Sequence, residues 1–378
     1  MTSILVAKGA QDAYLTDNPQ VSFFRSSYKR YGNFSQTVLS EVISGSATKG
    51  GISDITIDHK GDLLGHVFFT KKNSSGQLQP DITANDIEKV EVLIGDQIID
   101  SISTDQLVSE RFFGCEKYAR TQTSGYEKSG VLGFYGSYMY PLGFWFCGKY
   151  SFSLPVIALQ YHTIRIRITW GAAPETGGYY EAWANYIHLD TKEREEMASK
   201  SMVVAIPQHQ EAPLGTGLSL NLPFNNPVRY IYGRAGTTDI MGKPVPDITE
   251  KIWLCVNGVD LTDQKEIHPH YTAVPCLYNT YWGGYNATET LVDVVPTVSA
   301  GGVVTAVDVR KESGARPTFF HPFCLYVNDT TQWNGSCNFS RLDTFELKTT
   351  SPILTPIYGN SINILKFENG MGGLIFSS

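Results

Sequence analysis

Alternating apolar and polar positions mark the chain as rich in β-strands. In the segment HTIRIRITW at 162–170, isoleucine occupies every second position, with Arg165 and Arg167 between. Successive side chains of a strand point to opposite faces, so a two-residue period separates an apolar face from a polar one. This segment therefore predicts a strand with one buried face and one face in water.

Two further segments predict β-hairpins. The stretches at 88–99 and 250–261 alternate in the same way, and each contains a two-residue turn, Gly-Asp in the first and Asn257-Gly258 in the second. Asn-Gly is the strongest short hairpin signal, because both central residues of a type I′ turn need a positive φ. Each stretch is expected to fold as a strand, a tight turn and a second strand.

Helical patterns are few. The stretch 105–120 places apolar side chains on one stripe behind a Ser-Thr pair that can serve as an N-cap. The short charged stretch 191–200 follows Asp190, which with Glu193 matches a capping box. We interpret this second stretch as a helical linker between domains.

The two hairpins resemble each other, which indicates an internal repeat. Glu88-Lys89-Val90 in the first matches Glu250-Lys251-Ile252 in the second, and each turn follows at the same distance. A second pair keeps the same order, because one strand begins 23 residues after Pro141 and another begins 23 residues after Pro322. Two matching pairs in one order indicate a duplicated all-β domain.

The repeat is not evenly spaced. The offset grows from 162 residues at the hairpins to 181 at the prolines, so the second copy is expected to carry an insertion. We place this insertion at 283–315, a stretch rich in Gly, Thr, Ser and Val. A duplicated β domain of this length fits paired sandwiches or paired jelly rolls, and the pattern by itself does not separate the two.

Composition narrows the classes of function. The 378 residues suffice for two domains that each bury a core, and 18% of them are charged, below the roughly 25% of average soluble proteins. Such a surface fits a protein that covers much of itself with partners. The net charge of −7, without any run of Lys and Arg, argues against a nucleic-acid binder. The six cysteines include no C-x-x-C pair, so we expect buried free thiols.

Targeting signals are not apparent in the sequence. No stretch reaches the roughly 18 apolar residues that a membrane-spanning helix needs. The first residues, MTSILVAKGAQD, contain a short apolar patch that Lys8 and Asp12 close. We therefore expect no signal peptide and synthesis in the cytosol.

No catalytic constellation is recognisable. The only H-x-H motif is His268-Pro269-His270, and no carboxylate follows within 271–275 to complete a metal site. We interpret the motif as a Pro-rich loop with two exposed histidines. The sequence has no G-x-S-x-G elbow or P-loop, and the glycine run at 370–374 is interpreted as tight packing. We expect no enzymatic activity, no cofactor and no metal.

The sequence also contains possible acceptor sites for N-glycosylation. Six N-x-[ST] sequons occur, at Asn33, Asn73, Asn286, Asn328, Asn334 and Asn338. In a cytosolic protein we expect them to be mostly inert. Asn286, inside the predicted insertion, is the candidate for a surface glycan.

Several segments resemble signature blocks of the major capsid proteins of nucleocytoplasmic large DNA viruses. They follow the order of that family: GAQDAYLTDNPQVSFF at 9–24, YKRYGNF at 28–34, LPVIALQYHTIRIRI at 154–168, YIHLDTKERE at 186–195, FNNPVRYIY at 224–232, NGSCNFSRLDTFEL at 334–347 and NILKFENGMGGLIFS at 363–377. The first and last blocks are the most specific. Asp17, Thr163 and Tyr232 depart from residues that are frequent in the family, which leaves the virus lineage open.

The resemblance implies an all-β fold of two consecutive eight-stranded jelly rolls, with a few short helices in loops and linker. The domains expected from it are an N-terminal arm at 1–25, a first roll at 26–190, a linker at 191–200 and a second roll at 201–378. The second roll is expected to carry an enlarged loop at about 279–316.

The resemblance also implies a function. Members of the family form homotrimers whose six rolls make a pseudo-hexagonal capsomer of an icosahedral virion, assembled in host cytoplasm. The expected partners are further copies of the chain, neighbouring capsomers, and minor capsid proteins or an inner membrane layer, without direct nucleic-acid binding. In the arm, Asp12, Tyr14, Phe23 and Phe24 are candidate assembly residues. For the aromatic ones, capping of the first roll's core stays open as an alternative.

Two other functions stay open at this point. The chain could be a less abundant capsid paralogue, or a carbohydrate-binding protein of the virion surface. Tyr281 and Trp282, in the aromatic segment YNTYWGGYN, are the candidate contacts with sugars or other ligands in an exposed loop.

Overall fold

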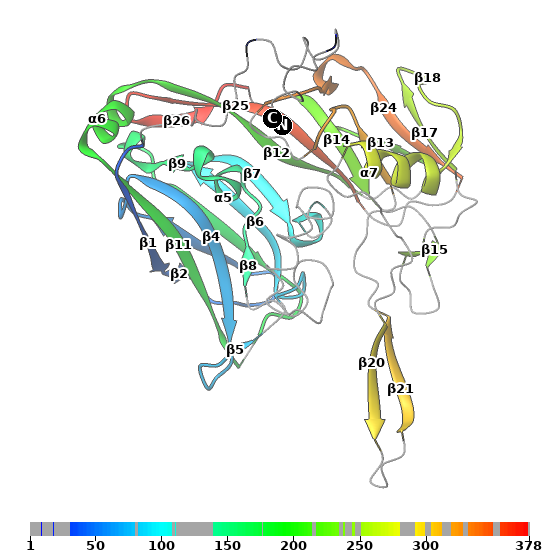
Figure 1. Cartoon of the computed structure of the whole chain (residues 1–378), viewed down its shortest axis with the longest axis horizontal. Helices are drawn as coiled ribbons and strands as arrows, with labels where there is room; N and C mark the ends of the chain where they lie inside the picture. The colour runs from blue at the N-terminus through cyan, green and yellow to red at the C-terminus, as the bar shows by residue number, and fades with distance from the viewer. Residues whose placement is uncertain are drawn as a thin grey trace. The chain divides into compact units, whose positions relative to one another are not determined.

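The computed structural model (Figure 1) describes most of the chain, and two compact units divide it at residue 34. β1 begins at this boundary, and all later elements lie in the second unit, 35–378. The described residues are 31–79, 82–107, 110, 139–175, 177–213, 217–233, 237–238, 244–245, 251–279, 292–298, 304–311, 319–327, 332–350 and 356–376, with Gly9 and Asn18.

Eight strands form the first roll. They are β1 (Phe34–Glu41), β3 (Ile52–Ile57), β4 (Leu63–Lys72), β6 (Ile87–Ile94), β7 (Gln97–Ser103), β8 (Tyr140–Pro141), β10 (Ile164–Trp170) and β11 (Tyr179–Leu189). One sheet has the order β1-β11-β4-β8 and the other has the order β3-β10-β6-β7. The short strands β2 (Ile43–Ser44), β5 (Leu78–Gln79) and β9 (Leu154–Pro155) extend these sheets.

The second roll repeats this plan. Its strands are β12 (Met202–Ala212), β13 (Ser219–Asn221), β14 (Pro227–Gly233), β17 (Lys251–Val256), β18 (Val259–Asp260), β22 (Phe319–Pro322), β24 (Phe345–Thr349) and β25 (Ile357–Glu368). The sheets have the orders β12-β25-β14-β22 and β13-β24-β17-β18. Short strands β19 (Lys265–Glu266), β23 (Cys337–Asn338) and β26 (Met371–Leu374) are added to them.

The order of pairing identifies the fold. Counted along each roll, the first strand pairs with the eighth, the eighth with the third and the third with the sixth, and the other sheet joins the second, seventh, fourth and fifth. Eight strands wound in this way between two sheets form a jelly roll. The predicted all-β double jelly roll is therefore confirmed, and the repeat read from the hairpins and prolines matches equivalent strands in the two rolls.

Local sequence explains the turns and the helices. Asn257 and Gly258, between β17 and β18, have φ of 49° and 79°, as the predicted type I′ turn requires. The charged helix predicted at 191–200 is α6 (Thr191–Ser199), and the side chain of Asp190 caps it by accepting a hydrogen bond from the Thr191 N–H. In the described residues, no helix has the length and apolar content needed to cross a membrane.

Other helices and hairpins are short. α5 (Trp145–Gly148) and α7 (Val274–Asn279) are single short helices. Of the helix predicted at 105–120, the structure describes helical residues at 104–107 and 110, and the rest lies outside the described residues. The predicted insertion contains a separate two-stranded sheet of β20 (Val292–Val298) and β21 (Val304–Lys311). A second small sheet joins β15 (Thr237–Thr238) and β16 (Pro244–Val245).

The apolar core of the first roll includes residues from strands of the second roll. β12 and β25 are the longest paired strands of the second roll, with 11 and 12 residues, and Figure 1 shows them running together across both rolls. Their far ends supply Ile206, Leu365 and Phe367 to the apolar core of the first roll. Their near ends supply Ala212 and Ile357 to the core of the second. One pair of strands therefore belongs to two cores, which the expectation of a separate core in each domain did not include.

Candidate functional site at the junction of the rolls

The residues singled out from the sequence do not form a site in the described part of the chain. Asp12, Tyr14, Phe23, Phe24, Tyr281, Trp282 and Asn286 lie outside the described residues. The H-x-H motif lies in a π-helix (268–273), so its interpretation as a loop was wrong. His270 lies 3.8 Å from the Glu266 carboxylate, one turn away, and among the described residues no three potential ligands group around a metal position. A site built from several elements is found instead between the rolls.

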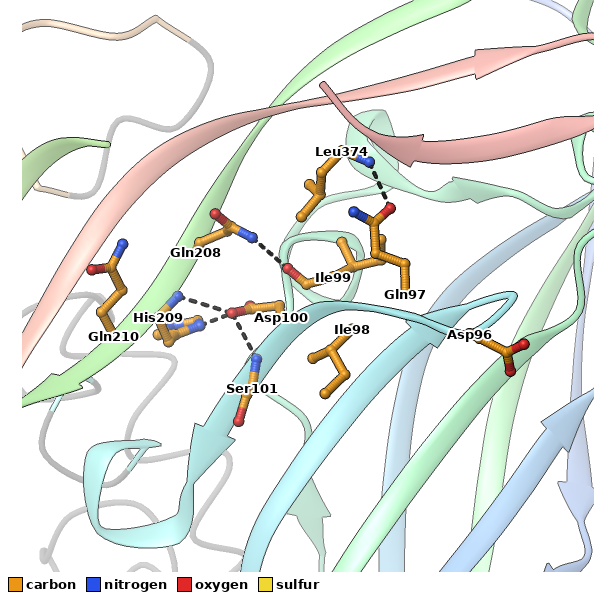
Figure 2. Close-up of a pocket in the computed structure, with 10 residues that line it drawn as sticks. All are labelled: Asp96, Gln97, Ile98, Ile99, Asp100, Ser101, Gln208, His209, Gln210 and Leu374. Carbon is orange, nitrogen blue, oxygen red and sulfur yellow. Dashed lines mark hydrogen bonds and ion pairs between the residues drawn. The ribbon is translucent and has the colours of Figure 1, made fainter. Parts of the chain in front are cut away.

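A buried ionic contact joins β7 of the first roll to β12 of the second. His209 Nδ1 lies 2.8 Å from Asp100 Oδ2, and the His209 N–H donates to Asp100 Oδ1 at 2.9 Å. Figure 2 shows the imidazole and the carboxylate facing each other between the two strands. The two side chains are only 3% and 0% exposed. Such a contact depends on its partners, since a buried charge is costly unless it is paired.

A second carboxylate completes the histidine's partners. Glu110, in the segment after β7, accepts a hydrogen bond from His209 Nε2 at 2.7 Å. Its other oxygen accepts hydrogen bonds from the Tyr230 hydroxyl at 2.5 Å and from Asn360 Nδ2 at 3.0 Å. Three strands of the second roll, β12, β14 and β25, therefore converge on one side chain of the first.

The protonation states follow from this arrangement. Burial by itself would lower the pKa of His209, but the negative charges of Glu110 and Asp100 and their hydrogen bonds raise this pKa well above its ordinary value. Burial would likewise raise the pKa of Glu110, but the positive His209 beside it brings this pKa below its ordinary value. The structure therefore holds His209 as an imidazolium that donates from both ring nitrogens, and Glu110 as a carboxylate.

A buried arginine balances the second carboxylate. Arg229 on β14 is 2% exposed and donates to the Val327 carbonyl at 2.7 Å and to Asn360 Oδ1 at 3.4 Å. Its guanidinium lies 4.8 Å from the ring centre of Trp333, within cation–π range. Arg229 also helps to lower the pKa of Glu110. The cluster of Asp100, Glu110, His209 and Arg229, here called the junction cluster, thus combines two carboxylates with two cations.

The junction cluster predicts a pH window for stability. A raised pKa in the folded state means that the contribution of His209 is complete below its ordinary pKa of 6.5 and is lost as pH rises through the raised value. The lowered pKa of Glu110 means that its contribution is complete above 4.5 and is lost as pH falls. The contribution should therefore be largest between these two values.

A variant that lacks the three titrating side chains measures this window. The free energy of unfolding of the native chain is compared with that of the triple variant Asp100→Asn, His209→Gln, Glu110→Gln by urea titration at several pH values. Above pH 6.5 the difference should fall by up to about 1.4 kcal/mol per pH unit, because His209 loses its proton in the unfolded chain while the folded chain keeps it. A difference that stays constant from about pH 5.5 to about pH 9 would show that folding does not raise the pKa of His209.

Polar contacts next to the junction cluster extend the attachment. Gln208 Nε2 donates to the Ile99 carbonyl at 2.5 Å, and Gln106 Nε2 donates to the Gln210 carbonyl at 3.3 Å. An open pocket of ≈ 510 Å³ lies here, between strands β7 and β12 and the C-terminal Leu374. Figure 2 shows the Leu374 N–H donating to the Gln97 side chain at its rim.

The C-terminal hairpin forms a further attachment through its glycines. Gly370, at φ 77°, accepts a hydrogen bond from the Tyr161 N–H at 2.9 Å. A Cβ at Gly372 would lie 2.6 Å from a methyl group of the buried Leu159, so any other residue would force Leu159 or the hairpin to move. The interpretation of the glycine run as tight packing is confirmed, and its packing partner is the first roll.

Sequence reasoning missed the junction cluster. A weak signal existed, because Gln208-His209-Gln210-Glu211 interrupts an otherwise apolar strand and Asp100 interrupts the alternation of β7. Buried polar residues within strands indicate contacts with another element. The pattern could not indicate which element that was, because 109 residues separate Asp100 from His209.

Comparisons with known proteins find major capsid proteins that are similar to this chain over almost its full length. A family model described as "Major capsid protein N-terminus" matches residues 22–190. The chain is 28% identical to the major capsid protein of Pyramimonas orientalis virus over 99% of this chain and 98% of that protein. It is 26% identical to the major capsid protein of Paramecium bursaria Chlorella virus 1 over 100% of this chain and 99% of that protein.

Solved structures share the fold. A quasi-atomic model of the PBCV-1 virus capsid matches with a TM-score of 0.67 and 20% identity, covering 94% of this chain and 100% of that one. The Faustovirus major capsid protein matches with a TM-score of 0.60 and 11% identity, covering 96% and 94%. At these sequence identities, the matches show a shared fold and nothing more specific.

Proposed function

We propose that this chain, which belongs to the major capsid protein family of the nucleocytoplasmic large DNA viruses, builds the virion shell as homotrimeric, pseudo-hexagonal capsomers. The chain is a structural protein of the capsid of a large DNA virus, similar over its full length to major capsid proteins. The homotrimer and its pseudo-hexagonal outline go beyond this similarity and are the proposed part.

The observation that supports the trimer is the joining of two like rolls in one chain. The rolls repeat the same strand order, and the shared strands β12 and β25 and the junction cluster attach one to the other. Three such pairs around a three-fold axis present six similar rolls, which suits hexagonal tiling. An attachment made of apolar core and buried ion pairs keeps the angle between the rolls constant, as tiling requires.

The remaining features of the proposal concern partners and place. Capsomers contact neighbouring capsomers and, beneath them, minor capsid proteins or an inner membrane layer, and assembly takes place in host cytoplasm. The arm residues Asp12, Tyr14, Phe23 and Phe24 are proposed to take part in assembly. The net charge of −7 supports a protein that does not bind the genome directly. We propose no catalytic activity and no cofactor.

The alternatives differ in what they require. A less abundant capsid paralogue would have the same architecture and would differ in copy number in the virion. Sugar binding would depend on Tyr281 and Trp282, and a glycan on Asn286; all three stay predictions.

The native mass of the purified chain tests the trimer. Light scattering after size exclusion should give a mass near three times the 41.9 kDa of one chain. A stable interface of the standard size or larger holds the trimer together at micromolar concentration. A mass of one chain at every micromolar concentration, in protein whose circular dichroism shows native β-sheet, would contradict the proposal.

A further inference from the structure

The contact between the two rolls has a defined form. In the segment that follows the fifth strand of the first roll, the described residues 104–107 and 110 lie against the outer face of the sheet β12-β25-β14 of the second. The aromatic residues Tyr230, Tyr232 and Tyr358 lie on this face, alternating with residues of the second roll's apolar core, yet they are 2%, 0% and 5% exposed. This outer face is therefore an interface, not a solvent surface.

The equivalent face of the first roll is more open. Tyr230 pairs with Pro322 in the sixth strand and with Asn360 in the eighth, and Phe68 pairs with Pro141 and Trp183 at the same places in the first roll. Phe68 and Trp183 thus occupy the positions of Tyr230 and Asn360. Both are only partly buried.

The same face continues onto β1. Phe68 and Trp183 alternate with core residues of β4 and β11, so they point away from the first core. Leu39 of β1 packs on that core, and its neighbour Val38, on the opposite face, is 52% exposed. We call this outer face of β1, β11 and β4 the socket.

The segment equivalent to 104–110 in the second roll has an exposed apolar face. It follows the fifth strand as a π-helix and α7, on which Val274, Leu277 and Tyr278 have the i, i+3, i+4 spacing of one helix face. They are 48%, 55% and 71% exposed. Leu325 and Tyr326, 64% and 54% exposed, follow on a segment that is hydrogen-bonded to the end of α7.

This face is held together as a unit. Asn279, at the end of α7, donates from Nδ2 to the carbonyl oxygens of Cys324 and Leu325 at 3.1 and 2.9 Å. The Val327 N–H donates in return to the Asn279 carbonyl at 3.1 Å. Five large apolar side chains on one ordered platform form a patch of the kind that marks protein interfaces. We call it the knob: Val274, Leu277, Tyr278, Leu325 and Tyr326.

We propose that the knob of one chain docks on the socket of a second copy, repeating between chains the contact that joins the two rolls within one chain. The inference rests on the proposed trimer and names its contact surfaces. The knob and the socket are different surfaces of the chain, so the contact is head-to-tail, and such contacts close into a ring when the rotation permits. Three copies then give six similar contacts, three within chains and three between them.

Site-specific cross-linking tests the location of this contact. A benzophenone amino acid replaces Tyr278 in a mixture of unlabelled and ¹⁵N-labelled chains, and mass spectrometry maps the cross-linked peptides after irradiation. Peptides of mixed isotope content that join residue 278 to 63–72 or 179–189 are expected. A trimeric mass with cross-links only to other surfaces would overturn the knob-and-socket contact and leave the proposed trimer standing. A monomeric mass would overturn both.

A charge in the knob provides a second measurement. Leu277→Asp should raise the concentration at which half the chains are trimeric by at least about tenfold, because it buries a carboxylate in each of three contacts. The matched control is Val259→Asp, an equally apolar and 70% exposed position on β18 outside both surfaces, which should leave the mass unchanged. Unchanged circular dichroism shows that each variant is folded. Equal effects of the two substitutions, or none from Leu277→Asp, would contradict the contact.

Discussion

Replacing His209 by alanine should lower the free energy of unfolding by about 3–5 kcal/mol. The substitution removes one cation of the junction cluster and leaves two carboxylates, Asp100 and Glu110, without their main partner. The Asp100 side chain has no exposed surface and that of Glu110 is 16% exposed, so water replaces the lost contacts only in part. Urea denaturation followed by circular dichroism measures the loss.

A second histidine provides the matched control. His59 lies on the surface of the first roll, so His59→Ala should change the free energy of unfolding by less than about 0.5 kcal/mol. If His209→Ala were as mild as His59→Ala, the junction cluster would not hold the rolls together.

Replacing Phe367 by alanine should cost about 3–5 kcal/mol, the usual range for a phenylalanine removed from a core. Phe367 belongs to β25 of the second roll, but its ring lies 1% exposed in the core of the first roll. The cavity should therefore weaken both rolls. Urea denaturation gives the size of the effect, and hydrogen–deuterium exchange should show faster exchange in β6 and β10 of the first roll as well as in β25.

A substitution at an exposed position nearby is the control, because it changes the same pair of strands without changing a core. Val203, on β12 and paired with Lys366, is 60% exposed. Val203→Ala should cost less than about 0.5 kcal/mol. An effect of Phe367→Ala confined to exchange in the second roll would mean that the two cores are independent.

The strand framework could be predicted because it is encoded locally. The alternation of Ile164, Ile166 and Ile168 is visible in the sequence, and all three are fully or almost fully buried on one face of β10. Asn257-Gly258 specifies its turn through backbone geometry alone. Repeated local patterns of this kind then indicated the duplication, and the family resemblance separated jelly rolls from other sandwiches.

The junction of the rolls could not be predicted, because it depends on contacts between distant segments. Glu110 and Asn360 are 250 residues apart, and nothing near either residue indicates the other. The regular pattern also fails in β12, where Ile206 and Ala212 serve two different cores and Gln208 lies between them. A strand shared by two domains shows mixed periodicity, and the sequence alone reads this as weak amphipathicity.

The contacts between the rolls matter for the function because they fix how the two rolls are oriented. A shell subunit must present its two rolls at a constant angle, and the junction cluster, the shared strands and the C-terminal hairpin each contribute to that constancy. Moving one roll against the other would leave buried charges of the junction cluster without partners, which is costly, so the cluster favours the observed arrangement.

Electron microscopy of the purified protein tests the capsomer most directly. Averaged images viewed down the three-fold axis should show one particle with six lobes of similar size, arranged as a closed pseudo-hexagon of three two-lobed chains. Isolated two-lobed particles, or open chains of them that do not close into a ring, would contradict the account.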